Sequence, residues 1–196
     1  TGLFPEQAAN WSWMMDKISK ANSPIKVLNL FAYTGGATCA ASYAGAEEVC
    51  HVDASKGMVA WAKENAELSG LSNNKIRYIV DDCFKFVQRE IRRGNKYDAV
   101  IMDPPSYGRG PNGEIWKFEE ELTKLLKLTS QVLSDEPLFL LLNSYTTGLS
   151  PTAIENMLKL IIVKDKQGSV SSGEIGLPVK REDLILPCGI YGRWEK

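Results

Sequence analysis

Residues 25–36 read IKVLNLFAYTGG, a run of apolar and β-favouring side chains that ends in two adjacent glycines. The first seven residues have the composition of a buried strand. Residues 37–44 follow with small side chains, which suit a helix packed closely on a sheet. A strand, a glycine turn and a helix in this order form the first unit of a parallel α/β sheet.

The same alternation of short apolar runs and amphipathic segments continues along the chain. Further strands are predicted at residues 48–53, 75–80, 97–102 and 137–145, and helices at residues 56–68, 83–93, 118–133 and 150–163, with a polar loop at residues 106–113. The tail changes character, because residues 170–177 and 184–194 look like two strands without a helix between them. The sequence predicts an α/β fold with a doubly wound, seven-stranded, mostly parallel sheet and a C-terminal antiparallel hairpin.

Composition excludes several classes of protein. A chain of 196 residues buries one ordinary core, so it needs no metal or disulfide to fold. A formal net charge of −1 argues against nucleic-acid binding by bulk charge over the whole surface, although a local basic patch stays open. No apolar run approaches the roughly 20 residues of a membrane span, and no signal peptide opens the chain. We expect a soluble protein.

The cysteines and the histidine suggest no metal or redox site. Cys39, Cys50, Cys83 and Cys188 are scattered without the spacing of zinc ligands. They are predicted to be small core residues in a reducing compartment. His51 lies inside a predicted strand, where a structural role is expected.

Carboxylates follow the predicted strands, at the edge where open parallel sheets bind ligands. Asp53 comes 18 residues after Gly35, near the spacing at which an acid binds ribose hydroxyls. Asp81 and Asp82 follow the third strand, and Asp82 is placed to receive an adenine amino group beside the backbone N–H of Cys83. These positions predict an adenosine site. A tight turn with an exposed aspartate, and a helix cap at Asp82, are the alternatives.

The glycine turn distinguishes between nucleotide ligands. One glycine pair stands where dinucleotide-binding proteins have G-x-G-x-x-G, so this turn is less suited to bind a pyrophosphate. A sulfonium methyl donor carries no phosphate and benefits from nearby carboxylates. The pattern favours a methyl donor, with an NAD-binding oxidoreductase left as an alternative.

The sharpest motif is Asp103-Pro104-Pro105-Ser106-Tyr107, directly after the fourth predicted strand. Two consecutive prolines rigidly aim the adjoining carbonyls and side chains into the cleft. The acid before them can accept a hydrogen bond from a planar nitrogen nucleophile, and Tyr107 could stack on a base. As structure alone, the double proline would be a stiff loop.

Five segments together carry a family resemblance. They are Leu28-Asn29-Leu30-Phe31-Ala32-Tyr33-Thr34-Gly35-Gly36, Val52-Asp53-Ala54-Ser55, Asn65 with Gly70-Leu71, Asp82, and Asp103-Pro104-Pro105-Ser106-Tyr107. They resemble a class I S-adenosylmethionine-dependent methyltransferase and, more narrowly, are similar to the group that contains the bacterial 23S ribosomal RNA base methyltransferases. Thr1-Gly2-Leu3-Phe4-Pro5-Glu6-Gln7 also resembles that group, in which a T-G-x-F-x-x-Q segment precedes the donor site and helps to cover it.

The resemblance implies a role for each matching segment. Asp53 would hold the donor ribose, Asp82 the adenine, and the turn at residues 31–36 the methionine end, while residues 103–107 would face the acceptor. The implied cofactor-binding residues are Phe4, Gln7, Asn29, Phe31, Ala32, Tyr33, Thr34, Gly35, Gly36, Asp53, Ala54, Ser55, Asp81, Asp82 and Cys83.

Two departures from the family pattern matter. Asn29 stands where the family usually has an acid, so it can hydrogen-bond but supplies no charge. Leu142-Asn143-Ser144-Tyr145 has no cysteine at the place where members that methylate carbon 5 of cytosine carry their nucleophile. We therefore expect direct in-line transfer to a nitrogen or an oxygen, without covalent activation of a pyrimidine.

The expected acceptor is a base nitrogen of ribosomal RNA, contacted by Tyr107 and Arg109. The basic stretch Lys85, Arg89, Arg92, Arg93 and Lys96 is more typical of a solvated helix face. Trp11 and Trp13 are expected to pack against the first helix. A small-molecule or protein methyltransferase, and a non-catalytic donor-binding subunit, stay open as alternatives.

We expect one methyltransferase domain over residues 1–196, with an entrance segment and first helix at residues 1–24 and the core at residues 25–196. The abrupt start at Thr1-Gly2-Leu3-Phe4-Pro5 suggests that an N-terminal region, which would supply much of any RNA affinity, is missing. The resemblance also implies a cytoplasmic protein that uses S-adenosylmethionine and needs neither a metal nor a membrane.

Overall fold

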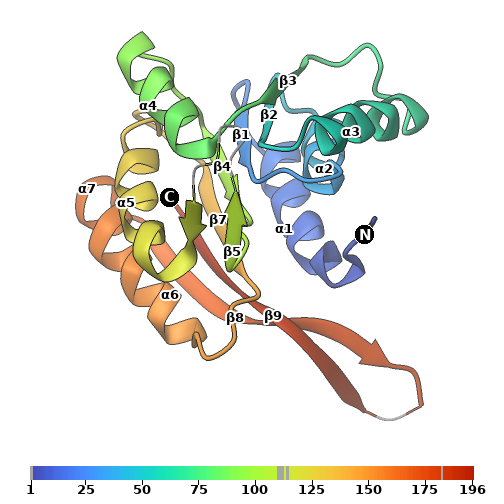
Figure 1. Cartoon of the computed structure of the whole chain (residues 1–196), viewed down its shortest axis with the longest axis vertical. Coiled ribbons are helices and arrows are strands. Elements are labelled where there is room, and N and C mark those ends of the chain that lie inside the picture. The colour runs from blue at the N-terminus through green and yellow to red at the C-terminus, as the bar shows by residue number, and fades with distance from the viewer. Residues whose placement is uncertain (1, 110–112, 114, 182) are drawn as a thin grey trace.

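A computed structural model describes residues 2–109, 113, 115–181 and 183–196, and Thr1 of the predicted entrance segment lies outside that range. Its centre is a seven-stranded sheet with the order β3-β2-β1-β4-β7-β9-β8 (Figure 1). The strands are β1 Lys26–Leu30, β2 Glu48–Asp53, β3 Ile76–Val80, β4 Ala99–Met102, β7 Phe139–Ser144, β8 Ser169–Val179 and β9 Leu184–Glu195. All neighbours up to β7 pair in parallel, whereas β9 is antiparallel to both β7 and β8, as the sequence predicts.

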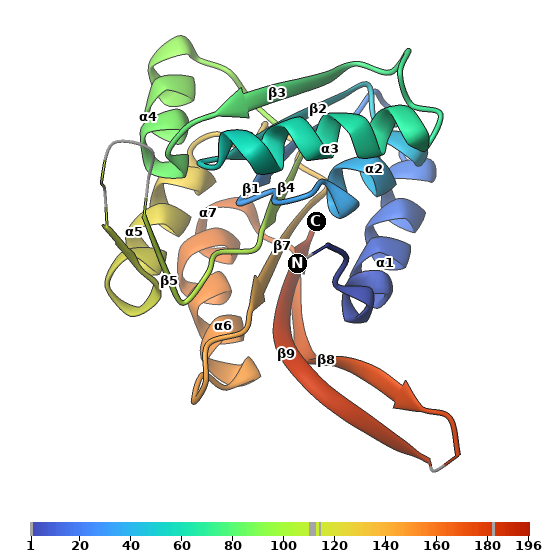
Figure 2. The same cartoon turned by 45° about the vertical axis from the view of Figure 1, so that its right-hand side comes forward.

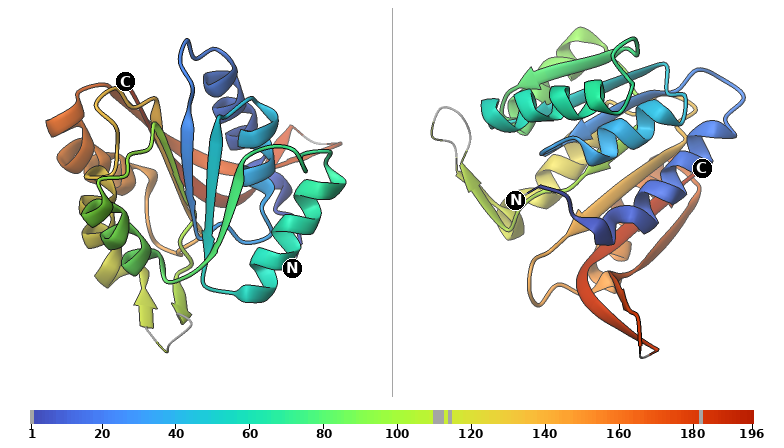
Figure 3. Two further views of the ribbon diagram at one scale, coloured as in Figure 1. Left: turned by 90° about the horizontal axis from the view of Figure 1, so that it is seen from above. Right: turned by 90° about the vertical axis from the view of Figure 1, so that its right-hand side faces the viewer.

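Helices cover both faces of this sheet, with α1–α3 on one side and α4–α6 on the other (Figure 3). A short 3₁₀ turn at Pro5–Gln7 leads into the first of them. The helices are α1 Ala8–Ser19, α2 Gly36–Tyr43, α3 Lys56–Leu68, α4 Cys83–Arg93, α5 Phe118–Ser130, α6 Pro151–Leu158 and α7 Lys164–Lys166. This is the doubly wound arrangement expected from the alternating pattern.

Alternate residues of the central strands feed two separate cores, because side chains of a strand point to opposite faces. Leu28, Met102 and Leu140 pack with α4–α6. Val27 and Ile101 pack with α1 and α2 on the other face. The period of two assigns the polar residues at positions 29, 51, 103 and 143 to the α1–α2 side, near the ends of their strands.

Strand ends shift by one or two residues from the prediction, and three larger differences concern helices and the predicted loop. Helix α5 ends at Ser130 rather than residue 133, because Leu133 forms an isolated bridge with Tyr97, two residues before β4. The helix that begins at Pro151 continues beyond residue 163 through a π-helical turn, Lys159–Val163, into α7. A small antiparallel pair was not predicted: β5 Tyr107–Arg109 lies in the predicted loop, and β6 Ile115–Lys117 lies between that loop and α5.

The C-terminal hairpin is longer than predicted and extends well beyond the sheet (Figure 2). Its outer half exposes Val179, Leu184, Ile185 and Leu186. Its inner half is anchored by Trp194, which is fully buried and donates from Nε1 to the Gln167 carbonyl at 2.6 Å. Within the described part of the chain, no helix has the length and apolarity to cross a bilayer.

Candidate active site

The turn after β1 adopts a strained conformation. Phe31 and Tyr33 have φ values of 55° and 50°, in the left-handed region that aromatic residues rarely adopt, and Gly35 has φ 87°. Hydrogen bonds hold the turn in place, since Ala32 N donates to the Val52 carbonyl at 3.1 Å and Asn65 Nδ2 donates to the carbonyl of residue 34 at 2.8 Å. Backbone strain of this kind concentrates at functional sites.

The glycine pair is required because two helices approach the turn closely. A Cβ at Gly35 would lie 2.9 Å from the Ala62 Cβ of α3, and one at Gly36 would lie 2.8 Å from the ring of Trp11 on α1. A side chain at Gly35 would push α3 away from the turn, and one at Gly36 would displace the Trp11 ring. Trp11 therefore packs against the turn that begins α2, consistent with the packing role expected for it.

Asp53, at the end of β2, is tied to the backbone on both sides. Its Oδ2 accepts from Tyr33 N and its Oδ1 accepts from Ser55 N, each at 2.9 Å. Each carboxylate oxygen can accept a further hydrogen bond. The side chain is thus held in one orientation at the edge of the largest cavity of the site.

Asp82 and Asp81 have different surroundings. Asp82 is the N-cap of α4, where its Oδ1 accepts from Lys85 N at 2.9 Å, and it also lines the large cavity. Asp81 accepts from Asp82 N and forms an ion pair with Arg89. The helix cap weighed for Asp82 is present, and the same residue also lines the site.

The large cavity has a volume of about 570 Å³ and runs from Asp53 to Asp103. This volume lies within the roughly 300–1,000 Å³ of ordinary ligand pockets. Its lining comprises Phe4, Phe31, Tyr33, Asp53, Ala54, Ser55, Asp82, Cys83, Phe84, Asp103, Pro104, Pro105, Gly108, Arg109, Trp116 and Tyr145. It therefore offers apolar and aromatic walls with carboxylates at both ends, which suits a nucleoside joined to a charged group.

Asp103 stands at the far end of this cavity. Its Oδ1 is buried and has no hydrogen-bond partner among the described residues. Burial, reinforced by the nearby charge of Glu6, raises the pKa of Asp103 to about 7. A buried carboxyl without a partner suits a group that meets a hydrogen-bond donor on an incoming molecule.

Trp116 of β6 fixes the proline pair that follows Asp103. Its Nε1 donates to the Pro105 carbonyl at 2.6 Å. Its ring packs against Phe31 at 5.0 Å and Phe84 at 6.3 Å between centroids. The small β5–β6 hairpin thus connects the glycine turn, the start of α4 and the proline pair.

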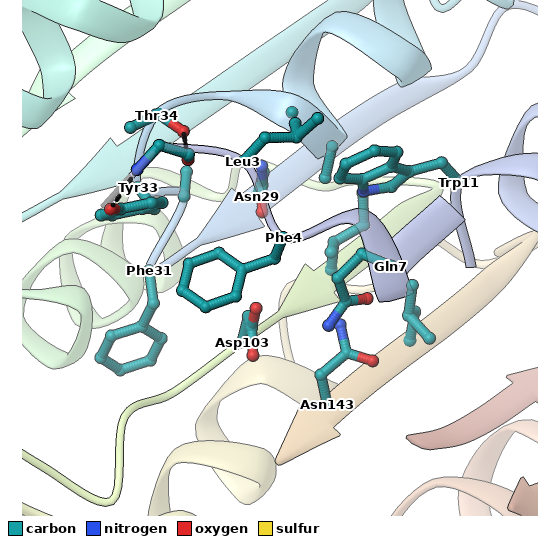
Figure 4. A pocket seen from close by; sticks show the side chains of 16 residues that line it. Leu3, Phe4, Gln7, Trp11, Asn29, Phe31, Tyr33, Thr34, Asp103 and Asn143 are labelled. Atoms are coloured by element: carbon teal, nitrogen blue, oxygen red, sulfur yellow. Dashed lines mark hydrogen bonds between the residues drawn. The ribbon is translucent and has the colours of Figure 1, made fainter. Parts of the chain in front are cut away.

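Residues 2–7 cross the opening of the site as a strap (Figure 4). Gly2 N donates to the Tyr33 hydroxyl at 3.0 Å, and the Thr34 hydroxyl donates to the Gly2 carbonyl at 2.8 Å. The ring of Phe4 packs against Tyr33 at 5.5 Å and Tyr145 at 5.8 Å. The strap covers the turn, as expected for the segment that includes Phe4.

Beneath the strap lies a second, smaller cavity of about 50 Å³, bordered by Asn29, Asp103 and Asn143 (Figure 4). Gln7 Nε2 donates to the Tyr145 hydroxyl at 2.7 Å. Asn10 Nδ2 donates to both Gln7 Oε1 and Asn143 Oδ1. These contacts fasten the strap and α1 to the end of β7.

Most predicted site residues meet at these two cavities. They are Phe4, Gln7, Asn29, Phe31, Ala32, Tyr33, Thr34, Gly36, Asp53, Ala54, Ser55, Asp82, Cys83, Asp103, Pro104, Pro105 and Arg109. Gly35, Asp81, Ser106 and Tyr107 line neither. Ser106 bonds to the Thr146 hydroxyl at 2.9 Å, and Tyr107 lies exposed on β5.

Sequence reasoning missed four residues that line the large cavity, Phe84, Gly108, Trp116 and Tyr145. Tyr145 is the last residue of the strand predicted at residues 137–145, so the strand-end rule could have found it. Trp116 lies between the loop predicted at residues 106–113 and the helix predicted from residue 118, where the sequence carries no comparable signal.

The basic stretch of α4 is largely engaged within the protein. Arg89 pairs with Asp81, Arg93 with Glu90, and Lys96 Nζ donates to the Gln131 carbonyl at 2.7 Å. Arg109 instead lines the large cavity. The structure therefore leaves Arg109 as the better-placed cation of those considered from the sequence.

Comparison with known proteins supports the same interpretation. Residues 1–133 match the family described as S-adenosylmethionine-dependent methyltransferase. Ribosomal RNA large subunit methyltransferase I of Aeromonas salmonicida is 37% identical over 107 residues, which are 55% of this chain and 26% of that protein. Ribosomal RNA large subunit methyltransferase K/L of Shewanella frigidimarina is 34% identical over 135 residues, or 68% of this chain and 18% of that protein.

A solved structure is also similar over almost the whole chain. The SAM-dependent methyltransferase from Agrobacterium tumefaciens superposes with a TM-score of 0.94 at 41% identity, covering 99% of this chain and 63% of that one. The chain thus spans about a quarter or less of the two curated relatives and under two thirds of the solved one. With its strand order, its glycine turn and the family match over residues 1–133, the chain belongs to the S-adenosylmethionine-dependent methyltransferases.

Proposed function

We propose that this protein methylates a base nitrogen of ribosomal RNA by direct transfer from S-adenosylmethionine. The observation that carries the proposal is the single cavity that joins Asp53 and Asp82 at one end to Asp103 at the other. One ligand can therefore occupy the first end while an acceptor reaches the second.

The first end fits the donor. S-adenosylmethionine supplies, when bound, an electrophilic methyl group on a positively charged sulfur. We assign the ribose hydroxyls to Asp53, the adenine to Asp82 and the backbone N–H of Cys83, and the methionine end to the turn at residues 31–36 and Asn29. The rigid hold on Asp53 supports this assignment, because a fixed carboxylate binds two hydroxyls with little ordering cost.

The second end fits a planar nitrogen acceptor. Asp103 would accept a hydrogen bond from the acceptor, and the proline pair, held by Trp116, would keep that acceptor in line with the methyl group. Residues 143–145 are Asn-Ser-Tyr, without a thiol. Cys83 does line the cavity, but burial raises the pKa of its thiol, which makes it a poor nucleophile. Both observations support direct transfer.

The acceptor class rests on the relatives. Both curated relatives are named as ribosomal RNA large subunit methyltransferases. Arg109 at the cavity and the exposed Tyr107 nearby offer a cation and a ring for a nucleotide. A ribosomal RNA substrate would place the protein in the cytoplasm.

The test is mass spectrometry of nucleosides from ribosomal RNA of the native host and of a strain that lacks the whole gene. We expect one methylated nucleoside to disappear and to return with the wild-type full-length gene but not with Asp103→Asn. An unchanged profile would contradict the ribosomal RNA acceptor and favour a small-molecule or protein acceptor. Restoration by Asp103→Asn would remove Asp103 from the acceptor site.

A further inference from the structure

A chain of three polar side chains lies buried beneath the glycine turn, on the α1–α2 side of the sheet. Asn29 Nδ2 donates to the Thr38 hydroxyl at 3.0 Å, and that hydroxyl lies 2.9 Å from His51 Nδ1. The three residues are 2%, 0% and 0% exposed. They come from β1, α2 and β2, so the chain connects the core of the sheet with the edge of the site.

The direction of the hydrogen bonds follows from the donors. The Thr38 hydroxyl accepts from Asn29, and we assign its one proton to the bond with His51 Nδ1, which requires the imidazole tautomer that carries its proton on Nε2. His51 then carries its own proton on Nε2, which has no partner among the described residues. Burial lowers the pKa of His51 to about 4, and the ring is therefore neutral near pH 7. A protonated ring would have no lone pair on Nδ1 for Thr38.

With that tautomer, the Thr38 hydroxyl can only accept from Asn29, and this sets which end of the Asn29 amide faces the site. Its nitrogen is directed toward Thr38, which leaves Oδ1 for the smaller cavity. No described residue donates a hydrogen bond to that oxygen. Figure 4 shows the Asn29 side chain beside the segment that carries Leu3 and Phe4. The cavity therefore presents a carbonyl oxygen beside the glycine turn.

An amide needs such support where a carboxylate does not. A carboxylate accepts hydrogen bonds with either oxygen, whereas an amide turned by half a revolution presents two N–H donors. Donors facing an ammonium group would repel it. An asparagine at this position can serve a cationic ligand only when something prevents the amide from turning.

We propose that Thr38 and His51 are positioning residues that hold the Asn29 oxygen toward the ammonium group at the methionine end of the donor. This deepens the proposed function and rests on it. The histidine that the sequence suggested to be structural thereby acts on the ligand through Thr38 and Asn29, without touching it.

The test compares two ligands that differ at the methionine end. S-adenosylhomocysteine carries the ammonium group, and 5′-methylthioadenosine lacks it. Calorimetry on the full-length protein should show that Thr38→Val weakens S-adenosylhomocysteine about tenfold, as expected for one lost hydrogen bond. The affinity for 5′-methylthioadenosine should stay within about twofold of wild type, since a twofold change is well under 1 kcal/mol.

Two further variants keep the result interpretable. Thr38→Ser retains the hydroxyl and should restore the affinity for S-adenosylhomocysteine. His51→Leu removes the acceptor of the Thr38 proton and should reproduce the selective loss of Thr38→Val. Equal losses for both ligands, or no loss, would overturn the positioning role. A wild-type protein that binds neither ligand would overturn the proposed function and this inference with it.

Discussion

At the scale of single residues, Asp53 is the group whose role is most directly measurable. Replacing it by alanine removes the acceptor proposed for the ribose hydroxyls and should weaken donor binding by about 1.5–3 kcal/mol, as for hydrogen bonds to a charged group. Calorimetric titration with S-adenosylhomocysteine measures this loss.

Asp98→Ala is the matched control. Asp98 also accepts a backbone N–H, from Lys26 at 2.9 Å, but at the opposite end of the sheet. Both variants lose an aspartate that braces the backbone, so a drop in affinity shared by both would reflect general destabilisation. Unchanged affinity in Asp53→Ala would contradict the proposed position of the ribose.

Asp103 should separate turnover from donor binding. Asp103→Asn keeps the shape of the side chain but loses an acceptor oxygen, so we expect a fall in kcat of about 100-fold or more, the scale of one positioned catalytic contact. Donor affinity should stay within about threefold, well under one tenfold step of 1.4 kcal/mol. Methyl transfer from labelled S-adenosylmethionine measures kcat, and calorimetry measures donor affinity. Retained activity in Asp103→Asn would contradict the place of Asp103 in the acceptor site.

The sequence predicted the residues of the site better than their partners. Asp53, Asp82 and Asp103 could be found because each directly follows an apolar run, and strand ends of a parallel sheet meet. The buried contact between Asn29 and Thr38 could not be found, since nothing in the sequence shows which helix residue will lie over β1. Sequence position identifies candidates, but packing selects their neighbours.

At the scale of elements, the strands and long helices were predictable and the short hairpin was not. Residues 97–102 and 137–145 are nearly all apolar and can only be buried. By contrast, β5 and β6 have three residues each, too few for a periodic signal. The π-helical turn after α6 also lacks a signature, because its residues continue the apolar spacing of the helix.

The hairpin gives an element-scale prediction. Trp116→Phe should keep the ring packed between Phe31 and Phe84 but lose the hydrogen bond to the Pro105 carbonyl. We expect a modest loss of stability, about 1 kcal/mol, and a larger loss of kcat, about tenfold or more, because the proline pair is freed. Urea unfolding measures the stability and steady-state kinetics measure kcat. A stability loss without a change in kcat would show that Trp116 contributes to packing and does not position the proline pair.

At the scale of the whole molecule, two buried groups oppose each other in the pH dependence of stability. The folded-state pKa of His51 is lowered from 6.5 to about 4. The neutral buried ring therefore costs no free energy of unfolding above pH 6.5, but that free energy falls as the pH drops from 6.5 toward 4, because only the unfolded chain binds the proton. The folded-state pKa of Asp103 is raised from 3.8 to about 7. Its effect on the free energy of unfolding is the reverse: there is no loss below pH 3.8, and the free energy falls as the pH rises from 3.8 toward 7, because only the unfolded chain releases the proton. Each effect amounts to about 3–4 kcal/mol at most.

Single variants should expose each contribution. Asp103→Asn should lose stability on acidification from pH 6.5 to 4, and His51→Leu should gain it, while the wild-type curve lies between them. Urea midpoints across this range provide the measurement. Carboxylates with lowered pKa values, such as Glu48 and Glu90, affect all three proteins alike. Parallel curves for the three proteins would show that neither group is titrated as described.

The position of β9 has a consequence for how the chain folds. In the sheet β9 lies between β7 and β8, although it follows both in sequence. During synthesis β1, β2 and β3 can pair as soon as residues 26–80 are available, whereas one edge of β7 stays open until Leu184–Glu195 arrive. An open edge on a strand that begins with four apolar residues favours mispairing between chains. We therefore expect the closure of β7 by β9 to be the late, aggregation-prone step, separate from formation of the glycine turn.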